Sequence, residues 1–240
     1  MSFTSTTKVG EIAAANPAAK KVLEQAGVDY CCGGAKSLGD ACMHAGVSAD
    51  EILRRLSENS MQAGPEDVNW TSARLKDLTR HIVEKHHKYV RAALPRVSTL
   101  LAMVRTKHGG NHPELARIEE EFLGLEREMY AHMQKEEQIL FPYMEKLERA
   151  EEGKEELEPP FFQTVQNPVR MMMQEHDSAG EALKAMRKLS HGYQPPTEAC
   201  ESYREVYRSL EEFAADMRTH VHLENNILFP RAVELEAKMR

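Results

Sequence analysis

The sequence predicts an all-α protein: a four-helix bundle of up-down-up-down topology, preceded by a small helical domain. From Thr71 onward, apolar residues recur with the helical period over most of the chain, and short connections join the periodic segments. Alternation of apolar and polar residues, which would indicate strands, does not persist anywhere. The 240 residues are enough to bury a real core.

Composition divides the chain into three parts. Residues 1–58 combine small residues with short helical patterns and hold three of the four cysteines. Residues 59–70 contain Gly64-Pro65 and no periodicity, which is typical of a linker. We therefore expect a small helical domain over 1–58, a linker over 59–70 and the bundle over 71–240.

The first domain carries several local signals. Val9 to Ala26 predicts one or two short helices bent near Asn16-Pro17, because the residue before a proline disfavours the helical region. A helix from Ser37 to His44 can end at Gly46. Ser48 to Glu51 is a capping box that opens another helix.

Four long helices are expected in the bundle. Pro95 lies inside the first and can kink it, and the glycines after His108 supply a C-terminal cap. A charged loop over 151–160 separates the second helix from the third. The predicted helices cover about 72–107, 113–150, 167–190 and 197–238.

Charge and hydropathy exclude several classes of function. The net charge of −7 and the mixing of acidic and basic residues argue against nucleic-acid binding. No apolar run approaches the roughly 18 to 20 residues needed to cross a bilayer, and the N-terminus lacks the apolar core of a secretory signal. A cytoplasmic location away from membranes is the expectation, and the four cysteines are interpreted as thiols or ligands.

One sequence motif occurs twice in the chain. His132 and Glu136 stand four residues apart, as do His220 and Glu224, and Ile-Leu-Phe-Pro follows each pair. Side chains at i and i+4 share one face of a helix, so each pair can direct an imidazole and a carboxylate at the same point. Two such pairs facing each other in a bundle can hold two metal ions.

The repeat extends further, to His87 and His176. These residues precede His132 and His220 by 45 and 44 residues, so each helical hairpin contributes a His followed by His-x-x-x-Glu. A single helical His or Glu is usually solvated, but the matched repetition favours inward-facing ligands. Six potential ligands result: His87, His132, Glu136, His176, His220 and Glu224.

Four imidazoles and two carboxylates suit borderline divalent metals. Iron is favoured over magnesium or calcium, which prefer all-oxygen cages, while zinc and manganese also fit the composition. If both glutamates bridge two irons, each iron receives two histidines and two carboxylate oxygens, and an oxide bridge adds a fifth ligand. Such a site leaves room for a small molecule on iron.

Several other residues remain open. Periodicity does not choose between His86 and His87. Asp177, next to His176, is a candidate for orienting a ligand. Met171 to Met173 are expected to fill the core. The remaining candidates are interpreted as surface, capping or orienting groups: His81, His108, His112 and His222.

Cys31 and Cys32 lie on a glycine-rich turn. Adjacent cysteines do not easily pair with each other, because disulfide geometry strains the peptide between them. Their thiols could bind a metal, exchange disulfides with a partner or bond to a second copy of the chain in a homodimer. Cys42 and Cys200 have no such context and are interpreted as structural.

Together these motifs resemble a known family. Asp29-Tyr-Cys-Cys-Gly-Gly34, a linker, and a hemerythrin-like bundle with His132-x-x-x-Glu136 and His220-x-x-x-Glu224 are similar to the di-iron proteins that repair iron–sulfur clusters after nitrosative or oxidative damage. The likeness covers nearly the whole chain. It implies His87 rather than His86 as the first ligand, bridging roles for both glutamates, and a place near the site for His108.

The resemblance implies a stress-response protein that restores damaged clusters by supplying iron, with Cys31 and Cys32 engaging the recipient or receiving iron in transit. Expected partners are damaged iron–sulfur proteins and the diatomic gases nitric oxide and oxygen. The alternative is a gas scavenger, carrier or sensor without repair activity. Oxidase or reductase chemistry needs electron delivery, and no flavin or pyridine-nucleotide motif is present, so the question of an enzyme stays open.

Overall fold

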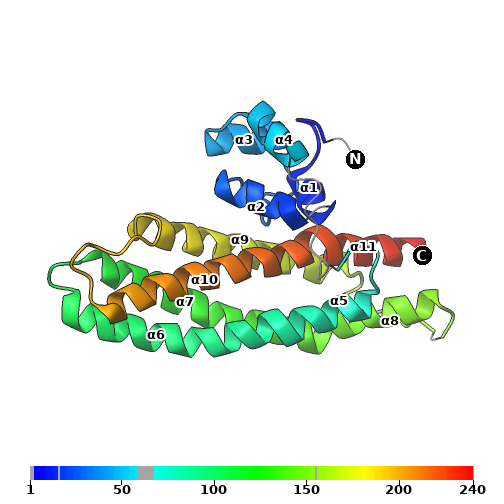
Figure 1. The fold of residues 1–240 in the computed structure, drawn as a ribbon. Coiled ribbons are helices and arrows are strands. Elements are labelled where there is room, and N and C mark those ends of the chain that lie inside the picture. Colours follow the sequence, from blue (N-terminus) through cyan, green and yellow to red (C-terminus); the bar gives the residue numbers. More distant parts are fainter. Residues whose placement is uncertain (1–2, 16, 59–67, 155, 240) are drawn as a thin grey trace. The chain divides into compact units, whose positions relative to one another are not determined.

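The computed structural model describes residues 3–15, 17–58, 68–154 and 156–239, and within these ranges every regular element is a helix (Figure 1). An isolated bridge between Lys8 and Ser37 is the one strand-like pairing in these ranges. The all-α prediction is confirmed. Residues 59–67 of the expected linker, and Asn16 of the expected bend, lie outside the described ranges.

Four short helices form the N-terminal part: α1 (Val9–Ala15), α2 (Pro17–Gln25), α3 (Leu38–Ala45) and α4 (Ala49–Glu58). The segment from Val9 to Ala26, predicted to form one or two short helices, contains two. One apolar cluster holds these helices together, and its members include Ile12, Leu23, Leu38 and Ile52, all 0–1% exposed.

The predicted caps are only partly formed. Ser37 accepts a hydrogen bond from the Asp40 amide at 3.1 Å, and Gly46 ends α3 in the left-handed region at φ 70°. The Glu51 amide reaches Ser48 Oγ at 3.5 Å, but the Glu51 carboxylate binds Arg54. The capping box is therefore half formed.

The long helices of the bundle follow the predicted ranges within a few residues. Pro95 lies inside α6 without interrupting it, and Gly109 has φ −59°, so the expected glycine cap is not left-handed. The chain runs through α5 (Leu75–His81), η1 (Ile82–His87) and α6 (Lys88–His108), then α7 (Glu114–Lys135), η2 (Glu136–Leu140) and α8 (Phe141–Glu151), then α9 (Gln166–Leu189), and finally α10 (Glu201–Leu223), η3 (Glu224–Leu228) and α11 (Phe229–Lys238).

Three of these elements, η1, η2 and η3, are π-helical turns inside otherwise α-helical segments. Such turns are rare and occur frequently at functional sites. The sequence did not predict them. Each contains one of the six candidate ligands, as its last residue in η1 and its first in η2 and η3.

At the start of two helices, backbone amides donate hydrogen bonds to a carboxylate from a distant part of the sequence. Glu148 accepts the amides of Leu75 (2.7 Å) and Lys76 (3.3 Å) at the start of α5. Glu236 accepts the Val165 amide at 3.0 Å, just before α9. Both carboxylates are buried and stabilise amides that have no partner within their own helix.

Contacts group the chain into two compact units. One contains Met1–Thr79, Met144–Gln166 and Arg218–Arg240; the other contains Arg80–Tyr143 and Asn167–Met217. In the second unit α6, α7, α9 and α10 form the bundle core, where the rings of Phe122 and Phe213 meet edge-to-face at 5.5 Å. None of the described helices combines the length and apolar character needed to cross a membrane.

Candidate metal site

The six candidate ligands lie at corresponding points of the long helices. Each is buried, with no more than 1% of its surface exposed. Three lie in the π-helical turns and three in the flanking or facing α-helices. They are His87 in η1, His132 in α7, Glu136 in η2, His176 in α9, His220 in α10 and Glu224 in η3.

Glu136 is the carboxylate around which the imidazoles of the second compact unit gather. Its Oε2 lies 3.4 Å from Nε2 of His87 and 3.2 Å from Nε2 of His132. Nε2 of His176 lies 3.0 Å from Nε2 of His132. Nε2 is thus the atom that each of these rings directs inward.

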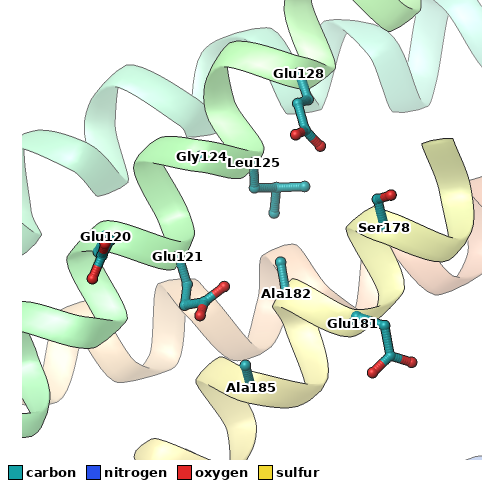
Figure 2. A pocket seen from close by; sticks show the side chains of 9 residues that line it. All are labelled: Glu120, Glu121, Gly124, Leu125, Glu128, Ser178, Glu181, Ala182 and Ala185. Carbon is teal, nitrogen blue, oxygen red and sulfur yellow. The ribbon is translucent and has the colours of Figure 1, made fainter.

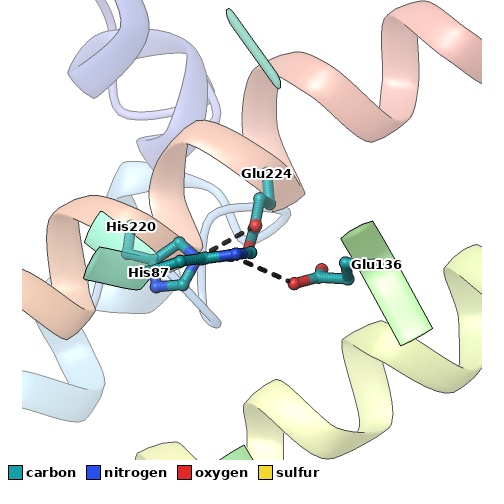
Figure 3. Close-up of side chains that lie close together, drawn as sticks. All are labelled: His87, Glu136, His220 and Glu224. Atoms are coloured by element: carbon teal, nitrogen blue, oxygen red, sulfur yellow. Dashed lines mark hydrogen bonds and ion pairs between the residues drawn. The ribbon is translucent and has the colours of Figure 1, made fainter. Parts of the chain in front are cut away.

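The second repeat copy has the same local geometry. Nε2 of His220 lies 3.0 Å from Oε1 of Glu224 (Figure 3). The ligand atoms fall into two groups, and within each group all atoms lie within 4.8 Å of one another. The groups are His87, Glu136, His220, Glu224 and His132, Glu136, His176, Glu224.

Both glutamates belong to both groups, and both are fully buried. Ionised carboxylates at such depth are costly unless a cation or strong donors compensate them. Each group offers two imidazole nitrogens and two carboxylates, a donor set that suits a borderline divalent metal. The residues therefore fit a metal site with two adjacent positions.

Comparison with known proteins agrees with this geometry. The model of the hemerythrin HHE cation-binding domain matches residues 78–232, and that of a domain of unknown function (DUF542) matches residues 5–60. A probable iron-sulfur cluster repair protein of Haemophilus influenzae is 33% identical over 97% of this chain and 99% of its own.

Two further relatives carry the same kind of name. The iron-sulfur cluster repair protein YtfE of Pectobacterium carotovorum is 32% identical over 95% of this chain and 97% of its own. That of Salmonella paratyphi B is 33% identical over 94% and 96%. This chain belongs to the iron–sulfur cluster repair protein family. Its hemerythrin domain binds iron, and all six buried candidate ligands lie inside the matched range.

In this family member, two carboxylates that the sequence pattern does not indicate orient two of the ligand histidines. Nδ1 of His87 lies 2.6 Å from Glu137, which also accepts from Arg91 at 2.8 Å. Nδ1 of His132 lies 2.8 Å from Glu175. With a proton on Nδ1, each ring directs the lone pair of an unprotonated Nε2 inward, which is the tautomer that a metal ligand requires.

The orienting carboxylates stay ionised because of these contacts. The hydrogen bond from His132, helped by Lys135, holds the pKa of Glu175 below its usual value despite partial burial. Burial pushes the pKa of Glu137 upward, but the hydrogen bonds from Arg91 and His87 outweigh it, so the pKa is lowered. A negative charge therefore persists beside both rings.

Two expectations about neighbouring residues are wrong. Asp177 does not orient a ligand: its side chain is exposed and has no hydrogen bond or ion pair with any described residue. Glu175, on the other side of His176, has the orienting position instead, toward α7. His108 is not near the site, since α6 separates it from His87 by about 30 Å at 1.5 Å per residue.

The choice between His86 and His87 is clear in the structure. His87 belongs to a ligand group, whereas Nδ1 of His86 lies 2.8 Å from Asp216, and the His86 ring meets that of His81 edge-to-face. His112 contacts Glu114 at 3.1 Å.

His222 lies on the same helix as His220 but outside both ligand groups. Burial, with a smaller effect from Lys20, lowers its pKa to about 3, so its ring is neutral near pH 7. Its ring packs edge-to-face against Tyr30 at 5.4 Å. Among the expected core methionines, Met172 is buried, but Met171 and Met173 are 52% and 39% exposed, so the core prediction holds for one of three.

The double-cysteine turn is organised by Asp29. One carboxylate oxygen, Oδ1, accepts the amides of Cys31, Cys32 and Gly33 at 3.1–3.2 Å, and Cys31 Sγ donates to it at 3.3 Å. The hydrogen bond with Cys32, together with burial, raises the pKa of the Cys31 thiol. Cys31 is buried and Cys32 is partly exposed.

The two isolated cysteines differ. Cys42 is buried in the N-terminal cluster, as a structural residue should be. Cys200 is exposed, and its Sγ lies 3.2 Å from Nε2 of His108. The structural interpretation of Cys200 is therefore wrong, because no core surrounds it.

A separate hollow of about 510 Å³ lies along α7 and α9 (Figure 2). Glutamates and small residues line it, including Glu120, Glu128, Glu181 and Gly124. None of the six candidate ligands lines it, and no metal-binding group among the described residues falls there. Residues that line it, such as Glu128, are therefore suitable positions for control substitutions in tests of metal binding.

Proposed function

We propose that this protein repairs damaged iron–sulfur clusters by supplying iron from a di-iron centre in its hemerythrin domain. The observation that carries the proposal is the pair of overlapping ligand groups, which share Glu136 and Glu224. A single metal would not need two carboxylates common to two sets of histidines. The repair-protein names of relatives that match the chain almost end to end support the same activity.

In the proposed centre, Glu136 and Glu224 would be ligands shared by two iron ions. His87 and His220 would complete one position, and His132 and His176 would complete the other. An oxide bridge would add one ligand to each ion. When bound, this centre supplies redox-active iron, which is also the cargo of the repair reaction.

The protein's own residues then have two tasks. Glu137 and Glu175 hold protons at Nδ1 of two ligand histidines and so keep Nε2 directed inward. Cys31 and Cys32 are proposed to engage the recipient or to receive iron in transit. The Asp29 carboxylate prearranges both thiols on one turn, which lowers the entropic cost of that step.

We assign recipient contact and iron binding to different domains. Residues 1–58 present the thiols, and residues 71–240 hold the iron. Iron–sulfur proteins are the proposed recipients, and the names of the relatives favour repair over gas binding alone. Nitric oxide and oxygen as ligands, a homodimer and a cytoplasmic location stay predictions.

The test uses an iron–sulfur enzyme inactivated by nitric oxide. Purified protein reconstituted with iron(II) should restore its activity, and the Cys31→Ala/Cys32→Ala variant should restore much less at equal iron content. A Cys42→Ala variant controls for loss of any thiol. Reactivation by free iron(II) at the same rate would refute repair, and equal rates for the double variant would remove the cysteines from the mechanism.

A further inference from the structure

We infer that Asn226 is a positioning residue that fixes the Cys31–Cys32 turn to the π-helical turn carrying Glu224. The inference rests on the proposed function, for which the two thiols must be held in place. All residues involved belong to the same compact unit, and α1 packs against η3 within it.

The side chain of Asn226 makes three polar contacts. Its Nδ2 donates to the carbonyl oxygen of Tyr30 at 3.0 Å and lies 3.3 Å from that of Cys31. The same atom lies 3.0 Å from Nδ1 of His222. A single amide group thus touches the backbone of the cysteine turn and a ring on its own helix.

Two glycines make room for this amide. A Cβ at Gly34 would lie 2.1 Å from Oδ1 of Asn226, and a Cβ at Gly10 would lie 2.3 Å from the same atom. The amide of Gly10 also donates to the carbonyl oxygen of Gly34 at 2.9 Å. Neither glycine has a positive φ, so close approach of Asn226 is what requires a residue without a side chain.

The turn is therefore held from two sides. Asp29 binds its amides from within the turn, and Asn226 binds its carbonyl oxygens from η3. Asn226 follows Glu224 by two residues in the same π-helical turn. Placement of the thiols is consequently tied to the helical turn that presents a bridging carboxylate.

The decisive experiment measures thiol modification in a Cys200→Ser background, with each site resolved by mass spectrometry. Asn226→Ala should raise the iodoacetamide reaction rate of Cys31 and Cys32 by about tenfold, as expected when hydrogen bonds to the turn are lost. Cys42, buried at 1% exposure, reports on the fold of the small domain and should stay unreactive. Unchanged rates at the pair, or equal exposure of Cys42, would overturn the inference.

The glycine contact gives a second, independent test. Gly34→Ala should raise the same rates, and combining it with Asn226→Ala should add nothing further, because the clash partner is gone. Gly39→Ala is the matched control, since its added Cβ meets nothing closer than 3.4 Å. Additive effects of the two substitutions would contradict a shared contact.

Thiol modification does not depend on iron transfer, so failure of the two ideas can be told apart. If wild type does not reactivate a damaged enzyme, the proposed function fails while the modification rates still test Asn226. If wild type reactivates the enzyme, Asn226→Ala should slow reactivation without changing the iron content. Lost iron content in this variant would assign Asn226 to metal binding and overturn its role as a positioning residue.

Discussion

At the scale of single residues, the shared glutamates distinguish this site from two independent metal sites. His176 belongs to one ligand group, whereas Glu136 belongs to both. The two residue types should therefore differ in how much iron their loss removes.

His176→Ala should lower the iron content by about half, and Glu136→Ala should remove nearly all of it, because a lost ligand weakens each ion it touches. Metal analysis of freshly purified protein measures this. Glu128→Ala, on the exposed face of α7, is the control and should retain wild-type iron. Equal losses from the histidine and glutamate variants would argue against bridging.

The orienting carboxylates should contribute less than the ligands. Glu175→Gln removes the charge beside His132 and should weaken iron binding by about 10- to 100-fold, the usual effect of losing a partner behind a ligand histidine. Competition with a chelator of known affinity measures the change. Asp177→Asn, two residues away and exposed, should leave the affinity unaltered; a matching loss there would restore the role first expected for Asp177.

The sequence predicted the six converging residues because their spacing repeats, but it missed Glu137 and Glu175. Both adjoin candidate ligands, and adjacency along a helix gives about 100° of rotation without saying toward which neighbour a side chain turns. Asp177 and Glu175 flank His176 symmetrically in sequence. Only the packing of α9 against α7 separates the exposed one from the one that meets His132.

At the scale of elements, the long helices were predictable from their period, and their starts were less so. The first was expected at Ser72 but begins at Leu75, where Glu148 supplies the cap from 73 residues away. No local signal encodes a remote cap. The π-helical turns were missed for a related reason, since they change hydrogen bonding without changing the composition of the segment.

The remote caps should contribute to stability. Glu148→Ala removes the acceptor of the buried Leu75 amide and of the partly buried Lys76 amide, and it should lower the free energy of unfolding by about 1–3 kcal/mol. Urea denaturation of the metal-free protein measures this without interference from iron. Glu151→Ala, exposed on the same helix, should change it by less than about 0.5 kcal/mol. An equal effect at both positions would indicate a general charge effect.

At the scale of the whole molecule, ligands from four long helical segments converge, so iron should stabilise the fold. Metal bound only by the native state adds about 2.7 kcal/mol when it exceeds its dissociation constant 100-fold. Chelation should accordingly lower the Tm by several degrees. Calorimetry before and after iron removal measures the shift. The Glu136→Ala/Glu224→Ala variant should show none, and a persisting shift would place the metal elsewhere.

The two carboxylates that accept amides at distant helix starts occupy equivalent positions in the two copies of the repeat. Glu148 comes twelve residues after Glu136, and Glu236 comes twelve after Glu224. Each hairpin therefore contains a helix start, its cap, two histidines and one shared carboxylate, and neither hairpin completes a metal position alone.

We therefore expect iron to stabilise the association of the two hairpins. If a specific protease site is inserted after Gly153, the cut protein should stay associated while iron is bound and separate more readily after chelation. Size-exclusion chromatography of the cut protein, with and without chelator, would show whether the metal joins the halves or only occupies a scaffold that holds together unaided.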